Sequence, residues 1–440
     1  MSLKQNATKK LAMILGSMAR LVLRSRKPIV IGITGSVGKS SAKEAIALVV
    51  SKNYRVRFSP GNYNNEFGLP SAILGIKSPG RSIVRWLSAC FHTILIVLRI
   101  ESYPEVLILE MGIDHPGDMD YLTSIARPDI AVLTRIAESH LANFENLAHI
   151  AKEKGKLIAA LPDDGIAVLN ADDERAMRQA DRTKAKIVSY GLSPGASLFA
   201  DNIRVLQENG RTEGLSFKLN SGGKSIPVRL PAVVARHHLP AVLAAAAVAA
   251  ALKMNLVDVA AALTEFRALP GRMTLLDGDA GIRIIDDTYN ASRVSTEAAL
   301  NTLRELIAPR KVVILGDMLE IGAGSNEAHR ALRDAVIASG ATVFVGVGQH
   351  MRFLADALHG TNFPEKSIHH YPDPLAARDR LAEHIRPGDL VLVKGSQGLR
   401  MEFIVERLLG EQGDAEKSAL LCRQSVAWKR TPFIAPAEWQ

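Results

Sequence analysis

The chain has 440 residues, enough for two or three domains that each bury a core of their own. Hydrophobic residues make up 47% and charged residues 22%, which is typical of a globular protein and excludes a disordered or fibrous one. The formal net charge is +9, but seven basic residues precede Pro28 with no acid among them, so the rest of the chain carries only +2 and nucleic-acid binding is not expected. The two cysteines, Cys90 and Cys422, lie far apart and form no metal-binding or redox spacing, so we expect a reducing, cytoplasmic environment.

The segment 1–27 is predicted to be a basic amphipathic leader. Its apolar residues recur at helical spacing, namely Leu11, Ile14, Leu15, Met18, Leu21 and Val22. Two interpretations stay open: the helix lies on an anionic membrane surface, or it packs on the first domain. A signal peptide is not expected, because the cleavage-site pattern is missing and Ser17 and Arg20 interrupt the apolar run.

The stretch "GITGSVGKSSAKE", residues 32–44, follows the apolar residues 29–31 and predicts a strand, a tight loop and a helix. Small loop residues let backbone N–H groups approach phosphate oxygens, and the following helix presents its positive end to them. Lys39 would then meet the outer phosphates and Ser40 a magnesium ion. The strict P-loop spacing requires glycine where this chain has Ile33, so an ordinary glycine-rich turn stays an alternative. The predicted nucleotide-binding loop consists of Gly35, Ser36, Val37, Gly38, Lys39, Ser40 and Ser41.

A second apolar segment, "WLSACFHTILIVL", covers residues 86–98 between Arg85 and Arg99. Its length is too short for a helix that spans a bilayer, which needs about 20 residues. We therefore predict a core or interfacial helix and no transmembrane span.

From Pro28 onward, short β-branched runs alternate with Ala- and Leu-rich stretches, which is the pattern of a parallel sheet covered by helices. The predicted strands include 29–34, 105–110, 130–134, 311–316, 342–347 and 390–395. An Ala-rich helix precedes "RALPGRM", whose Pro270 and Gly271 predict a boundary. We expect a central domain over 28–269, a C-terminal α/β domain over 270–410 and a tail over 411–440.

Charged residues follow two of these strands. "EVLILEMG" places Glu110 at the carboxyl end of a strand, where open α/β sheets bind their ligands. An isolated acid there is more often a capping group, but together with a phosphate loop upstream it indicates a magnesium ligand. Farther on, "ESHLANFENLAHIAKEKGKL" carries His140 after a loop and Lys154 on a helix that begins near Asn146. Spacing alone does not separate a chemical role for these two residues from a structural one.

A series of motifs occurs along the chain in a fixed order: "TGSVGKSS", "GNYNNEFGLP", "LEMGIDHPGDMDYL", "ESHLANF…AKEKGKL", "LNADDE", "LPGRM", "IDDTYNAS", "ILGDMLEIG…H" and "LVKGSQGLRMEFIV". Over about residues 29–409 the chain thereby resembles the Mur ligases, and most of all the MurF type, UDP-N-acetylmuramoyl-tripeptide:D-alanyl-D-alanine ligases. The resemblance implies an α/β fold with a central P-loop ATPase domain, whose sheet is mostly parallel, followed by a Rossmann-like α/β domain.

The resemblance also implies an activity: an ATP- and Mg²⁺-dependent amide ligase of peptidoglycan precursor synthesis. The γ-phosphate of ATP passes to a peptide carboxylate, the amine of D-Ala-D-Ala attacks the acyl phosphate, and phosphate leaves. This chemistry agrees with the residues, because a carboxylate is a poor electrophile until its oxygen becomes a good leaving group. Cations are needed to neutralise the negative charges that must meet.

By position, the resemblance assigns roles to the motif residues. The loop 35–41 would bind the triphosphate, Ser40 and Glu110 the first magnesium ion, and His140 a second metal ion. Lys154 matches the lysine that the family carbamylates, which turns an ammonium group into an anionic metal ligand. The predicted catalytic residues are Lys39, Glu110, His140 and Lys154.

Further contacts implied by the resemblance come from other loops. Arg272 of "LPGRM" and Asp287 of "IDDTYNAS" match residues that hold ATP. One loop matches a segment near the reacting end of the nucleotide, and another matches a segment that faces the amino substrate. The predicted substrate contacts in these two loops are Asn64, Asn65, Lys394 and Ser396.

Two departures from the family pattern bear on the substrates. MurF-type enzymes carry an N-terminal domain that grips the UDP-sugar, whereas here about 27 residues precede the phosphate-loop strand. We therefore expect the acceptor to be recognised by the central domain alone, by a partner protein, or at the membrane through the leader and residues 86–98. His238 and Ala241 stand where two asparagines are usual, which leaves the preference for ATP over GTP open.

Three hypotheses are compatible with these motifs. The first is a MurF-like ligase that takes a D-Ala-D-Ala-type dipeptide, and the second is a ligase of the same mechanism with a polyglutamate or folate-type acceptor. The third is a nucleotide-binding scaffold that acts by binding a partner. "NYNNEFG" and "DDTYNAS" favour the first over the second, and the retention of Lys39, Glu110, His140 and Lys154 argues against the third.

Overall fold

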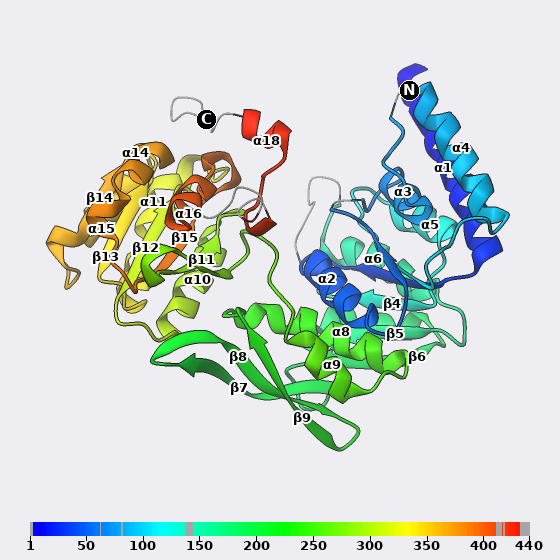
Figure 1. Cartoon of the computed structure of the whole chain (residues 1–440), viewed down its shortest axis with the longest axis horizontal. Coiled ribbons are helices and arrows are strands. Elements are labelled where there is room, and N and C mark those ends of the chain that lie inside the picture. Colours follow the sequence, from blue (N-terminus) through cyan, green and yellow to red (C-terminus); the bar gives the residue numbers. More distant parts are fainter. Residues whose placement is uncertain are drawn as a thin grey trace. The chain divides into compact units, whose positions relative to one another are not determined.

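The computed structural model describes residues 3–61, 63–80, 82–137, 144–410, 416 and 419–431, including all of their side chains except those of 3–9 and 323. The chain forms two compact units. The first comprises Met1–Ile203, Phe217–Val228 and His237–Phe266, and the second Arg204–Ser216, Arg229–Arg236 and Arg267–Gln440. Figure 1 shows the elements of both units. The domain limits expected from the sequence stay predictions.

The first unit is built around a parallel sheet. The strand order is β2-β3-β1-β4-β5-β6-β7-β8-β9, and every pair from β2 to β7 is parallel. Aliphatic residues fill the first strands because helices cover both of their faces. The strands that lie wholly in the first unit are β1 (Ile29–Thr34), β2 (Val56–Phe58), β3 (Val106–Glu110), β4 (Ile130–Leu133), β5 (Ile166–Asn170) and β6 (Lys186–Gly191). The last three strands have residues in both units: β7 (Leu198–Glu208), β8 (Arg211–Ser221) and β9 (Lys224–Pro231).

Two helical layers cover this sheet. Helices α2 (Lys39–Val50), α8 (Leu239–Ala251) and α9 (Leu256–Leu263) pack on one another, and α2 and α8 contact the strands (Figure 1). Leu107 and Leu109 of β3 point the other way, into a core shared with α1 (Leu3–Arg26), α3 (Gly68–Leu74), α5 (Asp118–Ile125) and α6 (Leu147–Ala159). Alternate strand residues point to opposite faces, so the second layer lies on the other side of the sheet. The remaining helices of the unit are α4 (Ile83–Val97) and α7 (Glu174–Met177).

The second unit holds a sheet in the order β10-β11-β15-β12-β13-β14, in which β10 is antiparallel to β11 and the other pairs are parallel. Val313 and Leu315 of β12 pack in one core with α10 (Arg293–Glu305), α12 (Arg333–Ala338) and α13 (Met351–Leu358). Val312 and Ile314 pack in another core with α14 (Pro374–Asp379), α15 (Leu381–His384) and α16 (Glu402–Leu408). Helices thus cover both faces, as in doubly wound folds. The strands are β10 (Thr274–Asp277), β11 (Arg283–Asp287), β12 (Lys311–Gly316), β13 (Val343–Val347), β14 (Ile368–Tyr371) and β15 (Leu390–Lys394).

The helices of the second unit are α10 (Arg293–Glu305), α11 (Ser325–Arg330), α12 (Arg333–Ala338), α13 (Met351–Leu358), α14 (Pro374–Asp379), α15 (Leu381–His384), α16 (Glu402–Leu408) and α18 (Val426–Arg430). The predicted α/β class with a mostly parallel first sheet and a Rossmann-like second one is confirmed. All six predicted strands are present, with ends within one residue of the predicted limits.

The leader is a helix, as predicted, and it packs on α3, α4 and α5 of the first unit. The predicted apolar face is partly wrong, because Ile14 and Leu21 are about half exposed. Alanines allow neighbouring helices to approach closely, and they turn α1 so that the face it buries consists of Ala12, Leu15, Ala19 and Val22.

The second apolar segment also forms the predicted helix. α4 is capped by Ser82, whose side chain accepts a hydrogen bond from the backbone of Arg85. Among the described residues, every helix is too short or too polar to cross a bilayer.

Candidate active site

The turn between β1 and α2 requires glycine at two positions. Gly38 caps α2 with φ of 86°, and Gly35 has φ of 150°. A Cβ atom at Gly35 would lie 2.0 Å from Oγ1 of Thr134, so the loop packs directly on the chain that follows β4. Thr134 Oγ1 donates to the carbonyl of Val37 at 2.7 Å, which fixes the loop from outside. The loop is therefore fixed in place before the N-terminal end of α2, which is a position where helices bind anions.

Two lysines from different helices donate hydrogen bonds to the same carbonyl oxygen of this loop. Lys39, the first residue of α2, and Lys154 of α6 each donate from Nζ to the carbonyl oxygen of Gly35 at 2.9 Å. Lys154 is only 2% exposed. Its burial, and next the positive charge of Lys39, lower the pKa of Lys154 to about 7, although Asp114 acts in the opposite direction. A large share of Lys154 is therefore an uncharged amine near neutral pH.

Glu110 is buried at the carboxyl end of β3, where the sequence places it. The pairing of β1 with β3 sets Glu110 opposite Ile33, next to the loop. Its Oε2 accepts from Ser40 Oγ at 3.0 Å and lies 3.6 Å from Nζ of Lys43. Its Oε1 accepts from Nδ2 of Asn64 at 3.4 Å. A hydroxyl and a carboxylate thus lie side by side at the start of α2.

A cavity of about 660 Å³ opens beside the two lysines. Lys39, Lys154 and Asn64 line it, and so do residues of α1 and α5. The phenol of Tyr121, on α5, donates to the carbonyl of Ala12, on α1, at 3.2 Å. The leader helix therefore forms one wall of this cavity.

The loop after β3 forms another wall and carries polar residues to which the sequence analysis gave no role. Asp114 and His115 line the cavity. Their backbone N–H groups donate to Oδ2 of Asp118 at 2.8 and 2.7 Å, and Glu153 accepts from the backbone of Gly117 at 2.9 Å. The available signal was their position, directly after Glu110 at the carboxyl edge of the sheet.

In the second unit, predicted residues gather where β11 and β15 end. These parallel neighbours set Asp287 opposite Lys394. Lys394 is almost fully buried and donates from Nζ to Oδ2 of Asp287 at 2.6 Å and to the carbonyl of Asn290 at 2.9 Å. Ser396 follows two residues later, and its Oγ accepts from the backbone of Leu319 at 2.8 Å.

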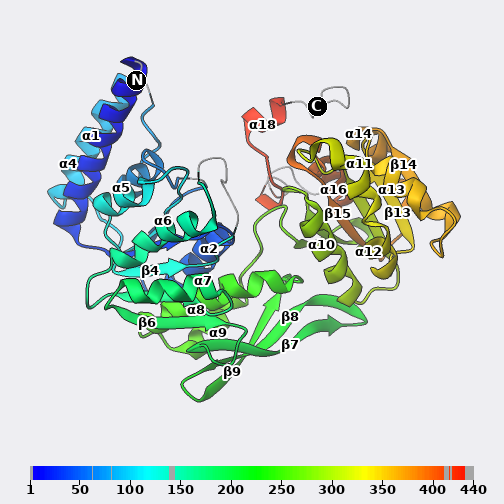
Figure 2. The ribbon, with the colours of Figure 1, turned by 180° about the vertical axis from the view of Figure 1, so that it is seen from behind.

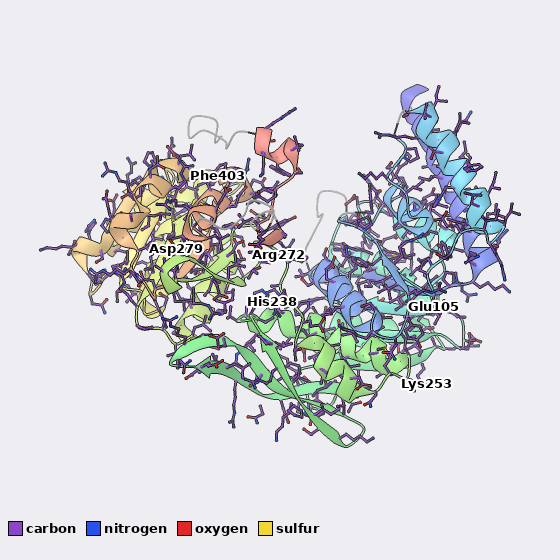
Figure 3. The ribbon with its side chains drawn as sticks, viewed as in Figure 1. Glu105, His238, Lys253, Arg272, Asp279 and Phe403 are labelled. Carbon is purple, nitrogen blue, oxygen red and sulfur yellow. The ribbon has the colours of Figure 1, made fainter. Side chains whose placement is uncertain are left out.

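Arg272, labelled in Figure 3, lies shortly before β10. Its guanidinium is 4.0 Å from the ring centre of Tyr289. The backbone N–H of Met273 donates to Oδ1 of Asp287 at 3.2 Å. The two predicted ATP contacts of this unit, Arg272 and Asp287, therefore belong to one connected cluster.

The other predicted residues take different places. His140 lies outside the described residues, and within the described part no group of three or more His, Cys, Asp or Glu side chains forms a metal site. Asn65 lines the cavity next to Asn64, and its Oδ1 accepts from the backbone of Gly68, the first residue of α3, at 2.9 Å. His238, just before α8 (Figure 3), and Ala241, within it, are both buried.

Comparison with known families matches both halves of the chain. Residues 91–249 match the Mur ligase middle domain, and residues 271–397 match the family described as Mur ligase, glutamate ligase domain.

Whole-chain relatives agree with these matches. The UDP-N-acetylmuramoyl-tripeptide–D-alanyl-D-alanine ligase of Escherichia coli is 30% identical over 93% of this chain and 83% of its own length. A crystal structure of MurF from Acinetobacter baumannii superposes with a TM-score of 0.74 at 25% identity, covering 91% of this chain and 81% of that one. MurF from Thermotoga maritima in complex with ADP gives 0.70 at 25% identity, covering 91% and 84%. The chain belongs to the Mur ligase family.

Proposed function

We propose that the protein is an ATP-dependent ligase that joins D-alanyl-D-alanine to a UDP-linked muramoyl-tripeptide in peptidoglycan precursor synthesis. This proposal rests on one arrangement at the edge of the cavity. Lys39 and Lys154 both donate hydrogen bonds to the carbonyl of Gly35, and the hydrogen-bonded pair of Ser40 and Glu110 lies beside them. The relatives named above act on these substrates according to their names. The cavity has the size of ordinary small-molecule sites.

In this proposal the loop 35–41 holds the triphosphate. Its backbone N–H groups and the positive end of α2 face the phosphates, and Lys39 moves from the carbonyl of Gly35 to the outer phosphate oxygens. Arg272 and Asp287 hold the rest of ATP. The ring of Tyr289 keeps the Arg272 side chain in place until the nucleotide binds.

Ser40 and Glu110 fit a magnesium ion. Both offer oxygen ligands, and they already lie 3.0 Å apart. Mg²⁺ in phosphoryl-transfer sites binds one or two carboxylates together with phosphate oxygens. When bound, it would offset the negative charge of the outer phosphates. Lys43, whose Nζ lies 3.6 Å from the same carboxylate oxygen, helps to hold Glu110 in position. The second metal ion and its ligand His140 belong to the same proposal.

Lys154 is suited to carbamylation. An uncharged amine attacks carbon dioxide at carbon, a C–N bond forms, and one proton leaves to give a carbamate anion. Only the uncharged amine reacts, and burial lowers the pKa of Lys154 to about 7, which supplies it at neutral pH. The carbamate would place a negative charge where the uncharged amine of Lys154 now lies, beside Lys39.

The substrates would meet these groups from two loops. Asn64 and Asn65, both on the cavity wall, would lie near the reacting end of the nucleotide and contact the substrate there. Lys394, held by Asp287, and Ser396 would contact the amino substrate. The carboxylate takes the γ-phosphate, the amine attacks the acyl carbon, and the C–O bond breaks with loss of phosphate.

A ligase of the same mechanism with a polyglutamate or folate-type acceptor is the second candidate. The non-catalytic scaffold is disfavoured, since burying Lys43, Glu110 and Lys154 beside the loop costs free energy that a scaffold has no reason to spend. Recognition of the UDP-sugar by a partner, and a peripheral location at the inner face of the membrane, complete the proposal.

The test is amide formation by the purified chain with ATP and Mg²⁺. Phosphate release and product mass are measured with D-Ala-D-Ala and UDP-N-acetylmuramoyl-tripeptide together and with each alone. Release that requires both substrates, with a product of the summed mass less water, is the expected result. Release that neither substrate stimulates, while ATP still binds, would overturn the assignment of the acceptor and the amine.

A further inference from the structure

Helix α4 presents an unusually large apolar surface to solvent. Its main neighbour is α1, and it buries only Ala89, Thr93 and Ile96. Exposed apolar side chains of this size are normally scattered singly. Here they follow one another along the helix and just beyond it, and each is more than half exposed: Ile83, Val84, Leu87, Phe91, Ile94, Leu98 and Ile100.

The leader helix lies alongside α4 in both ribbon views (Figure 1 and Figure 2). The two helices run in the same direction, because their C-terminal ends meet: Ser25 Oγ donates to the carbonyl of Val97 at 3.0 Å. α1 adds exposed apolar residues of its own, Met13, Ile14 and Leu21. We call these residues together with those of α4 the α1–α4 surface.

The charged residues within the two helices all have one sign, although Glu101, which follows Ile100, lies 3.0 Å from Nδ1 of His92 on α4. Neither helix contains an aspartate or glutamate. Arg85 and Arg99 are exposed near the two ends of α4, and Lys10 and Arg24 are exposed on α1. Long basic side chains can keep their charge in water while their stems lie along apolar surface. Large apolar residues between basic ones, without acids, are typical of helices that lie in a membrane interface.

We propose that the α1–α4 surface docks on an anionic lipid bilayer, with its apolar side chains at the boundary between headgroups and acyl chains and its basic residues against lipid phosphates. A second copy of the chain is a poorer occupant, because it would bring basic residues against basic residues. Spanning is excluded for α4, whose 15 residues cover about 22 Å of a hydrocarbon core about 30 Å thick. This docking is independent of the chemistry proposed above.

Docking has a consequence for the cavity. α1 carries Met13, which belongs to the α1–α4 surface and also lines the cavity beside Lys39 and Lys154. Lipid contact with α1 would therefore bring the membrane surface close to the place where the acceptor is proposed to react.

The test is co-sedimentation of the full chain with vesicles of phosphatidylglycerol and phosphatidylcholine in equal parts, and with vesicles of phosphatidylcholine alone. We expect the partition coefficient to be at least about tenfold higher on the anionic vesicles and to fall with added salt. The double variant Leu87→Gln/Phe91→Gln should lower binding to anionic vesicles at least about tenfold, because both side chains lose their transfer into the interface.

The matched control is Val257→Gln/Val294→Gln, which changes two exposed valines away from this surface and should bind like the unchanged chain. Amide formation from soluble substrates should be the same in both double variants, which separates a loss of docking from a loss of folding or catalysis. Equal vesicle binding by the two double variants would overturn the proposal. The proposal would also be overturned if the wild-type chain did not bind vesicles. The same holds if the wild-type chain formed a dimer and the variant Leu87→Gln/Phe91→Gln were a monomer.

Discussion

Two regions of the first unit, the surroundings of the cavity and the α1–α4 surface, depart in opposite ways from the usual burial of apolar side chains and exposure of ionisable ones. Beside the cavity, ionisable side chains are buried: Lys43, Glu110 and Lys154 are each at most 2% exposed. On the α1–α4 surface, large apolar groups such as Phe91 stay in water. Both arrangements cost free energy of folding. Stability therefore explains neither of them, and each indicates something that binds there.

The largest expected effect is the loss of catalysis in Lys39→Ala. Removing one preorganised cation from a phosphoryl-transfer site should lower kcat about 10²–10³-fold, as loss of a single transition-state donor does elsewhere. Steady-state phosphate release with both substrates measures it. Lys52→Ala is the matched control, because Lys52 makes only an exposed ion pair with Glu265. Equal kcat in the two variants would contradict the role of Lys39.

Gly35→Ala tests how tightly the loop is built. A methyl group there would overlap Oγ1 of Thr134 and would require φ of 150°. We expect the free energy of unfolding to fall by about 2–3 kcal/mol and ATP binding to weaken. Denaturant unfolding and nucleotide titration measure the two effects. Gly195→Ala, at a position with open space around it, should leave both unchanged.

The pH dependence of stability tests the burial of Lys154. Its folded pKa of about 7 is below its ordinary value of 10.5, so between these values the unfolded chain binds a proton that the folded chain does not. Stability contributed by this group is therefore lost as pH falls toward 7. In buffer free of carbon dioxide, the wild type should gain about 2 kcal/mol more than Lys154→Met between about pH 7 and pH 9. Parallel curves for the two proteins would show that Lys154 is not buried as described.

The smallest effect is expected for the stability of a variant on the α1–α4 surface. Phe91→Gln should change the free energy of unfolding by less than about 0.5 kcal/mol, because the side chain is already 63% exposed. Denaturant unfolding measures this directly. A loss of several kcal/mol would mean that Phe91 packs within the protein, and the contrast between the two sides would fail.

Much of the fold could be predicted because the strands are short aliphatic runs, such as residues 29–34, bounded by turn residues. The loop 35–41 and Glu110 could be placed for the same reason: each directly follows such a strand. The contact of Asp287 with Lys394 could not, because it depends on the pairing of β11 with β15, two segments far apart in the chain.

Which face of α1 is buried could not be predicted from the sequence either. A helical pattern with apolar residues on more than one face does not tell which face is buried, and here the alanines decide it through close packing. The part of α1 in the cavity wall follows from that packing. Asp114 and His115 were missed although they follow Glu110 at the carboxyl edge of the sheet, because the order of residues in a loop does not tell which of them line a cavity.

The most direct test of the central claim follows one oxygen atom. The activated carboxyl group of UDP-N-acetylmuramoyl-tripeptide is labelled with ¹⁸O, and the phosphate released during ligation is analysed by mass. If the carboxylate attacks ATP to form an acyl phosphate, the released phosphate must carry one labelled oxygen from the broken C–O bond. Ligation that releases only unlabelled phosphate would contradict the account.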